Sequence, residues 1–203
     1  MKIEGILADF YDAYVYVVSK EDECVIIDAG ASLDKVKEVV GNKKVVGLLL
    51  THGHFDHSFY CNKYADFFGC KIHANQNIVK TMSDSEAFYG DDGQTMDDFS
   101  RFTWIDEGPL KLGSFDIDCY FLPGHALCCM VYIIDNNLFS GDVLFEKSCG
   151  SVSLKFSDKT KMIESLERLQ TLEFNNIYSG HGKPSCKHEQ ENRIPIYLKF
   201  LRR

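Results

Sequence analysis

Short apolar runs bounded by turn residues alternate along the chain with longer amphipathic segments. In the first half, the apolar runs predict strands at residues 2–7, 14–19, 23–28, 45–50 and 70–73. Apolar residues at helical spacing predict a helix that begins after Ser32 as its N-cap, and another over about residues 58–68 that ends at Gly69. A short helix from about Asn75 follows. The first half therefore predicts a sheet with helices packed against it.

The same alternation returns in the second half. Its apolar runs predict strands at residues 110–112, 115–122, 130–134, 137–140 and 176–179. Helical spacing predicts helices over residues 157–172 and 188–201, the second one kinked near Pro195. Because the halves echo each other without a linker, the pattern predicts one domain over residues 1–203, a sandwich of two sheets flanked by helices.

The segment between the halves, residues 83–100, breaks this pattern. It is rich in acidic residues, contains Gly90 and Gly93, and has no sustained periodicity. Such a segment is typical of a functional loop or lid, with disorder as the alternative. Over a binding site, the negative charge of residues 84–98 would disfavour polyanionic substrates.

The densest polar chemistry lies in Thr51–His57, directly after the apolar run at residues 45–50. This stretch holds His52, His54, Asp56 and His57, and thus three of the seven histidines of the chain. Side chains that leave the end of a buried strand together can converge on one point. Since imidazole nitrogens and carboxylate oxygens are ligands of divalent metals, the stretch predicts a metal site rather than a histidine-rich surface loop.

Three later strand ends repeat one pattern, in which a glycine precedes a potential ligand. These ligands are His125, Asp142 and His181. Glycine lets the backbone turn sharply and approach a bound ion closely. Each pair alone would indicate only a polar turn, but together with Thr51–His57 they predict that four strand ends gather around one metal site. His73 and His188 lie outside these motifs and are expected to be structural or surface residues.

Charge and composition argue against several classes of partner. The chain has 22 basic and 30 acidic residues, a formal net charge of -8, and no basic patch, which disfavours binding to nucleic acid or an anionic membrane. The N-terminus lacks the regions of a signal peptide, and no apolar run approaches the roughly 20 residues of a membrane span. We therefore expect a cytoplasmic protein with a small-molecule substrate. Its oligomeric state is left open.

The eight cysteines form no CxxC pair, and most lie within apolar stretches. This distribution predicts reduced thiols that pack in the core. Cys128, Cys129 and Cys149 are nearest the predicted site and are candidate accessory residues.

Thr51–His57 resembles the His-x-His-x-Asp-His signature of the metallo-β-lactamase superfamily, and His125, Asp142 and His181 occupy the three downstream positions that this family uses. The similarity in order and spacing extends over nearly the whole chain. It implies the α+β fold of this family, a four-layer αβ/βα sandwich with two mixed sheets flanked by helices. Asp28, in Asp28-Ala29-Gly30, resembles an early Asp of the family that supports the ligands without binding metal.

The resemblance also implies a ligand set for two divalent metal ions. His52, His54 and His125 would hold the first ion, Asp56, His57 and His181 the second, and Asp142 would bridge them. Zinc is the expected metal, with iron or manganese as alternatives, because histidine and carboxylate suit all three.

Residues 139–145 narrow the implied activity. They are similar to the Gly-Asp-x-Leu-Phe segment of glyoxalase II-like hydrolases, which cleave thioesters and have relatives acting on esters and lactones. Antibiotic-degrading members usually lack the bridging carboxylate, so β-lactamase activity is not expected. The chain departs from thioesterase-like and persulfide-oxidising relatives at Ser151, where those proteins have Arg.

The favoured interpretation is a binuclear metal-dependent hydrolase, in which a metal-bridging hydroxide attacks a small thioester, ester or lactone. Asp56 would be a ligand and also the catalytic group that orients the water or accepts its proton. The alternatives are a phosphodiesterase or nuclease of the same fold, an iron-dependent persulfide dioxygenase, and a non-catalytic metal-binding domain.

Overall fold

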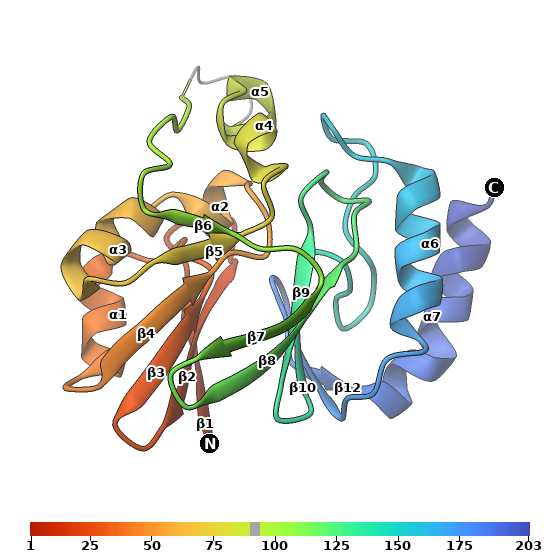
Figure 1. The fold of residues 1–203 in the computed structure, drawn as a ribbon. Coiled ribbons are helices and arrows are strands. Elements are labelled where there is room, and N and C mark those ends of the chain that lie inside the picture. Colours follow the sequence, from red (N-terminus) through yellow and green to blue (C-terminus); the bar gives the residue numbers. More distant parts are fainter. Residues whose placement is uncertain (90–93) are drawn as a thin grey trace.

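In a computed structural model that describes residues 1–89 and 94–203, two six-stranded sheets pack face to face and helices cover their outer surfaces (Figure 1). The first sheet has the order β1 (Lys2–Leu7), β2 (Tyr14–Lys20), β3 (Glu23–Ile27), β4 (Lys44–Leu49), β5 (Ile72–Ala74) and β6 (Phe102–Trp104). Strands β1 to β3 pair antiparallel, whereas β3 to β6 pair in parallel. The sheet is therefore mixed.

The second sheet is mixed as well. Its order is β12 (Ser185–Cys186), β11 (Asn176–Ser179), β10 (Asn137–Gly141), β9 (Met130–Ile134), β8 (Phe115–Phe121) and β7 (Gly108–Leu112). Only β10 and β11 pair in parallel among the described strands of this sheet, and the other pairs are antiparallel. The predicted sandwich of two mixed sheets is confirmed.

Helices lie on both outer surfaces of the sandwich and at one end of it (Figure 1). The first sheet is covered by α1 (Leu33–Val40) and α3 (Cys61–Phe68), and the second by α6 (Lys159–Leu169) and α7 (Lys187–Leu201). The short helices α2 (Phe55–Ser58), α4 (Ile78–Met82) and α5 (Ser85–Tyr89) lie near the strand ends. This end carries the candidate site.

The alternation of side chains along β2 explains how one sheet serves two interfaces. Tyr16 and Val18 belong to a cluster that joins apolar side chains of both sheets. Val15 and Val17 point to the opposite face and belong to a second cluster, which includes side chains of α1. Because successive side chains of a strand alternate between faces, a continuously apolar strand is the pattern expected for a sheet buried on both sides.

Three features differ from the predicted elements. The helix expected over residues 58–68 is found as α3, and the residues before it form the separate short helix α2. Strands β6 and β12 were not predicted, because runs of two or three residues carry little periodicity. Within the acidic segment predicted as a loop, residues 85–89 form α5, where the Asp84 carboxylate accepts a hydrogen bond from the Ala87 N–H at 3.1 Å. The part of this segment at residues 90–93 lies outside the described residues.

The helix ends agree with the sequence in part. Asp158 caps α6, because its carboxylate accepts a hydrogen bond from the Lys161 N–H at 2.9 Å, whereas Ser32 precedes α1 without a side-chain capping bond. Pro195 lies inside α7, and a kink there stays a prediction, as does the division into one domain.

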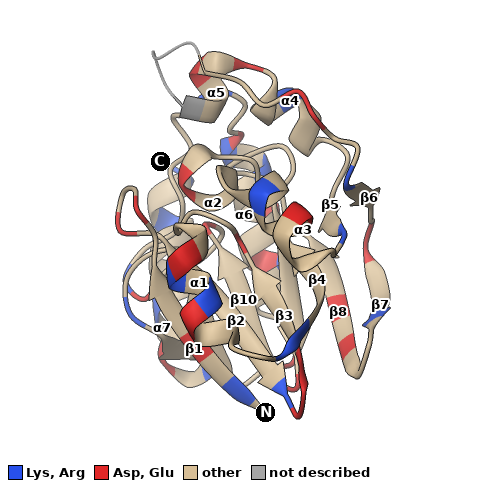
Figure 2. Cartoon of the chain, turned by 90° about the vertical axis from the view of Figure 1, so that its left-hand side faces the viewer, with Lys and Arg blue, Asp and Glu red and all other residues tan. Residues whose placement is uncertain are grey.

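On the side drawn in Figure 2, Lys and Arg positions are interspersed with Asp and Glu positions rather than gathered on one element. None of the helices in the described ranges is long and apolar enough to cross a membrane. The cytoplasmic location and the absence of nucleic-acid and membrane partners stay predictions.

Candidate metal centre

The seven predicted ligands meet at one edge of the sandwich, although they come from four separate strand ends. The loop after β4 and the adjoining α2 supply His52, His54, Asp56 and His57, and the ends of β8, β10 and β11 lead to His125, Asp142 and His181. Within the described part of the chain, the ligand atoms form groups whose members lie within 4.8 Å of one another. The structure thus brings together every residue of the predicted set.

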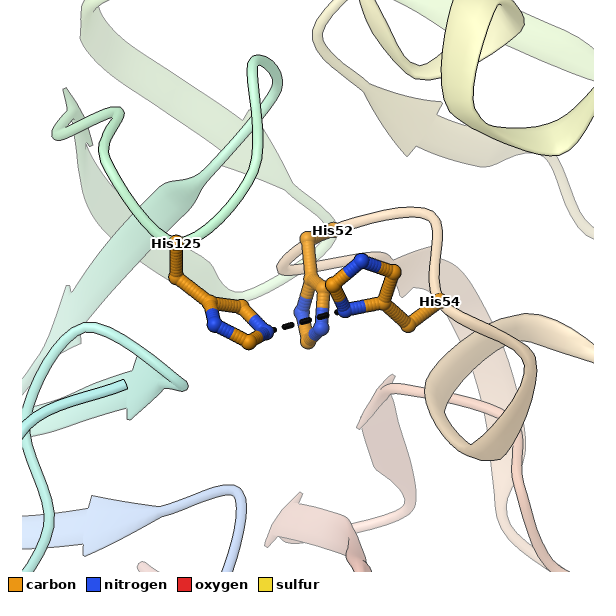
Figure 3. A group of neighbouring side chains, drawn as sticks. All are labelled: His52, His54 and His125. Carbon is orange, nitrogen blue, oxygen red and sulfur yellow. Dashed lines mark hydrogen bonds between the residues drawn. The ribbon is translucent and has the colours of Figure 1, made fainter. Parts of the chain in front are cut away.

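The first group consists of His52, His54 and His125 (Figure 3). The Nε2 atom of His125 lies 2.9 Å from Nδ1 of His54. The Nδ1 atom of His125 lies 3.0 Å from the carbonyl oxygen of Ser151, to which a protonated Nδ1 would donate. In a neutral imidazole, this donation leaves Nε2 without a proton, so that its lone pair can bind a metal ion. Nε2 faces the other members of the group.

The second group consists of Asp56, His57 and His181. The Nε2 atoms of the two imidazoles lie 3.3 Å apart, and Nε2 of His181 lies 3.2 Å from Oδ2 of Asp56. These three side chains are the ones that the family resemblance assigns to the second metal.

Asp142 lies between the two groups. Its Oδ1 atom is 3.4 Å from Nε2 of His57, in the second group, and its Oδ2 atom is 3.4 Å from Nε2 of His125, in the first. The carboxylate therefore faces both groups, which is the placement that a bridging ligand needs.

Asp28 fixes the orientation of His57 by contacting Nδ1, the ring nitrogen that faces away from the other predicted ligands. Its carboxylate accepts a hydrogen bond from the Thr51 N–H at 2.7 Å and one from the Thr51 hydroxyl at 2.8 Å, and it lies 2.8 Å from Nδ1 of His57. With Nδ1 engaged by a buried carboxylate, Nε2 of His57 is left to face Asp56 and Asp142. The predicted supporting position of Asp28 agrees with this geometry.

The pKa values of the histidines follow from burial and from the nearby carboxylates. Burial lowers the pKa of His54 to about 3, which keeps this imidazole neutral. Burial also acts to lower the pKa of His57, but Asp56 and Asp142 outweigh it and raise that pKa to about 9. The same two carboxylates raise the pKa of His181 to about 10 against burial. The second group is therefore an environment that favours positive charge.

Three observations fit a pair of divalent cations at this edge. Nε2 of His52 and Oδ1 of Asp142 are buried without a hydrogen-bond partner among the described residues. Ligands about 2.1 Å from a tetrahedral ion lie roughly 3.4 Å apart, close to the separations found here. At Gly180 a Cβ atom would overlap the Asp142 carboxylate, so the glycine is needed for this close approach. The residues present suit the two ions that the family resemblance implies.

A cavity of about 560 Å³ is lined by five of the predicted ligands, His54, Asp56, His125, Asp142 and His181. Among aromatic residues, Tyr11, Phe55 and Phe88 line it, whereas Phe59 packs against Phe10 and Phe55. Trp104 packs against other rings of the β6 region instead. The described part of the acidic segment contributes Glu86, Ala87 and Phe88 to the lining. The α5 part of this segment therefore lies beside the site.

Sequence reasoning missed the wall formed by the loop after β10. Ser153, Leu154 and Lys155 line the cavity, and the Ser151 carbonyl contacts His125. No local pattern marks these residues, because their role depends on a loop that approaches α5 from the other half of the chain. None of the eight cysteines lines the cavity; burial raises the pKa of Cys128 to about 11, which keeps it a thiol.

Comparison with known proteins shows which family this chain resembles in sequence and fold. Residues 8–181 match the metallo-beta-lactamase superfamily. A probable metallo-hydrolase, YqgX of Bacillus subtilis, is 28% identical over 201 residues, 93% of each chain. Hydroxyacylglutathione hydrolase GloC of Haemophilus influenzae is 31% identical over 189 residues, which cover 87% of this chain and 88% of that protein. The crystal structure of BLEG-1, a B3 metallo-beta-lactamase, covers 97% of this chain and 99% of its own with a TM-score of 0.86 at 24% identity, a likeness of fold.

Proposed function

We propose that this chain, which belongs to the metallo-beta-lactamase superfamily, hydrolyses a small thioester, ester or lactone with the help of two divalent metal ions. The observation that carries the proposal is the Asp142 carboxylate, which faces both ligand groups at 3.4 Å. A binuclear centre with an adjoining cavity is an arrangement suited to metal-assisted hydrolysis. Zinc is the proposed metal, with iron or manganese as alternatives.

When bound, the two ions would polarise the carbonyl of the substrate and lower the pKa of a water molecule. The residues of the chain would do the remaining work. Asp56 lines the cavity and lies 3.2 Å from Nε2 of His181, so its carboxylate is placed to orient the attacking water and accept its proton. Asp28 and the Ser151 carbonyl would hold His57 and His125 in the required orientation.

The similarity to hydroxyacylglutathione hydrolase supports a thioester as the first substrate to test. The phosphodiesterase alternative has less support, because Glu86 lines the cavity and the chain carries a net charge of -8. The sequence resemblance to glyoxalase II-like enzymes at residues 139–145 also supports a thioester substrate.

The test measures the hydrolysis rates of three substrates, a thioester, a lactone and bis(p-nitrophenyl) phosphate, with zinc-loaded protein. We expect the thioester or lactone to be hydrolysed fastest, and we expect His54→Ala and Asp142→Ala to lose both metal and turnover. His188→Ala is the matched control, because His188 is exposed and lies outside the centre. Faster cleavage of the phosphodiester, or full activity in His54→Ala, would contradict the proposal.

A further inference from the structure

Building on the proposed hydrolysis, we propose that the substrate carries an uncharged apolar acyl chain, which lies against Tyr11 and Leu154 in the cavity beside the metal centre. The two side chains come from different halves of the sequence, one from the loop between β1 and β2 and the other from the loop after β10. Both line the same cavity as the ligands His54 and Asp56.

Tyr11 presents its ring to solvent at the cavity with little contact from the protein. The residue is 72% exposed, and its backbone has a φ of 52°, in the left-handed region that an aromatic residue rarely adopts. The same turn brings Ala13 into a bridge with His181, and the N–H of Tyr14 donates to the Gly180 carbonyl at 2.8 Å. The turn therefore fixes the backbone of Tyr11 relative to the second ligand group.

Leu154 is placed in a similar way on the other wall. Its side chain is 47% exposed although it lines the cavity. It lies three residues after Ser151, whose carbonyl contacts the ligand His125. Two large apolar side chains are thus held at the reacting centre by backbone segments that touch ligands, and water covers much of their surface. Burying that surface against an apolar chain would be favourable.

The charges of the cavity wall disfavour an anionic group in this part of the substrate. Among the described lining residues outside the ligand set, Glu86 and Lys155 carry charge. Nζ of Lys155 lies 2.9 Å from the Glu86 carboxylate and 2.9 Å from that of Asp84. The lysine is already paired with two carboxylates, so an anionic substituent would meet net repulsion. The exposed apolar surfaces of Tyr11 and Leu154 suit an uncharged chain.

The size of the expected effect follows from the burial of methylene groups. Full burial of one methylene changes an equilibrium constant by about fourfold, so contact with half-exposed walls should give about two- to fourfold per methylene. The experiment compares kcat/KM for acetyl, butanoyl and hexanoyl thioesters of N-acetylcysteamine with zinc-loaded protein. In parallel, calorimetry measures the binding of acetate, butanoate and hexanoate, which requires no turnover.

Four variants make the comparison specific. Tyr11→Asn removes the ring but keeps a residue that tolerates positive φ, and Leu154→Asn replaces the second apolar wall. Tyr11→Phe keeps the ring and should keep the wild-type dependence on chain length. Phe200→Asn removes an equally exposed ring, 72% exposed on α7 and outside the cavity lining, and controls for general surface effects.

We expect both kcat/KM and alkanoate affinity to rise with chain length in the wild type, and each of the two asparagine variants to lose about half of that rise. A flat dependence in the wild type, or an unchanged one in both asparagine variants, would overturn the proposal. If alkanoates bind with the expected dependence but no thioester, ester or lactone is hydrolysed, the proposed function fails while the apolar wall is upheld.

Discussion

Replacing Asp28 with asparagine removes the charge that orients His57 while keeping the size of the side chain. In the structure, this buried carboxylate accepts two hydrogen bonds from Thr51 and contacts Nδ1 of His57 at 2.8 Å. An asparagine amide can keep one acceptor oxygen, but its NH₂ group must then face either the Thr51 hydroxyl or the His57 ring. The substitution therefore weakens the contact that leaves Nε2 of His57 free for the second ligand group.

The expected loss can be estimated from this contact. A buried hydrogen bond to a charged group contributes about 1.5–3 kcal/mol, which corresponds to roughly 10- to 150-fold in an equilibrium constant. Mutation of a group that orients a metal ligand typically lowers metal affinity or activity by about 10- to 100-fold. We therefore expect Asp28→Asn to weaken the binding of one zinc ion by about 10- to 100-fold. The affinity for the ion held by His52, His54 and His125 should change less.

The assay is a zinc titration of chelator-treated protein against a competing chromophoric chelator, which resolves two affinities. Thermal unfolding of the metal-free variant shows whether the fold is kept. Asp9→Asn is the matched control, because Asp9 is also a hydrogen-bonded carboxylate but pairs with Lys35 away from the ligands. Two wild-type affinities in a folded Asp28→Asn protein would refute the assignment of Asp28 as the group that positions His57.

Further substitutions test other parts of the account. Gly180→Ala adds a Cβ that overlaps the Asp142 carboxylate, and we expect a loss of about 1–3 kcal/mol in unfolding free energy together with lower metal content, measured by denaturation and elemental analysis. Leu166→Ala empties a fully buried position on α6, so urea denaturation should show a loss of about 2–5 kcal/mol with zinc stoichiometry unchanged. Lys155→Met removes the pairs with Asp84 and Glu86, and α5 should exchange its amide hydrogens faster while the melting temperature changes little.

The ligand set could be predicted because its signals are local. Each ligand lies in the loop or short helix that follows a strand, and the ends of β4 in the first sheet and of β8, β10 and β11 in the second sheet meet at one edge of the sandwich. Strands β1, β9 and β11 were predicted with their observed bounds. Asp28 was found only through the family resemblance.

The remaining features depend on contacts between distant segments. The three-residue strand β6 exists because it pairs with β5, and α5 buries Phe88 at the cavity. Lys155 meets Asp84 only when the loop after β10 reaches the other half of the sandwich. Such contacts leave no periodic pattern in either segment, so the cavity wall and its charge pairing became visible only in the folded chain.

Elemental analysis of the purified protein tests the central claim most directly. After loading with zinc and removal of free metal, we predict about two zinc ions per chain, as expected for three-residue groups joined by Asp142. Asp142→Ala should lose its bound zinc, whereas His188→Ala should match the wild type. A wild-type protein that neither carries nor takes up any divalent metal would contradict the account.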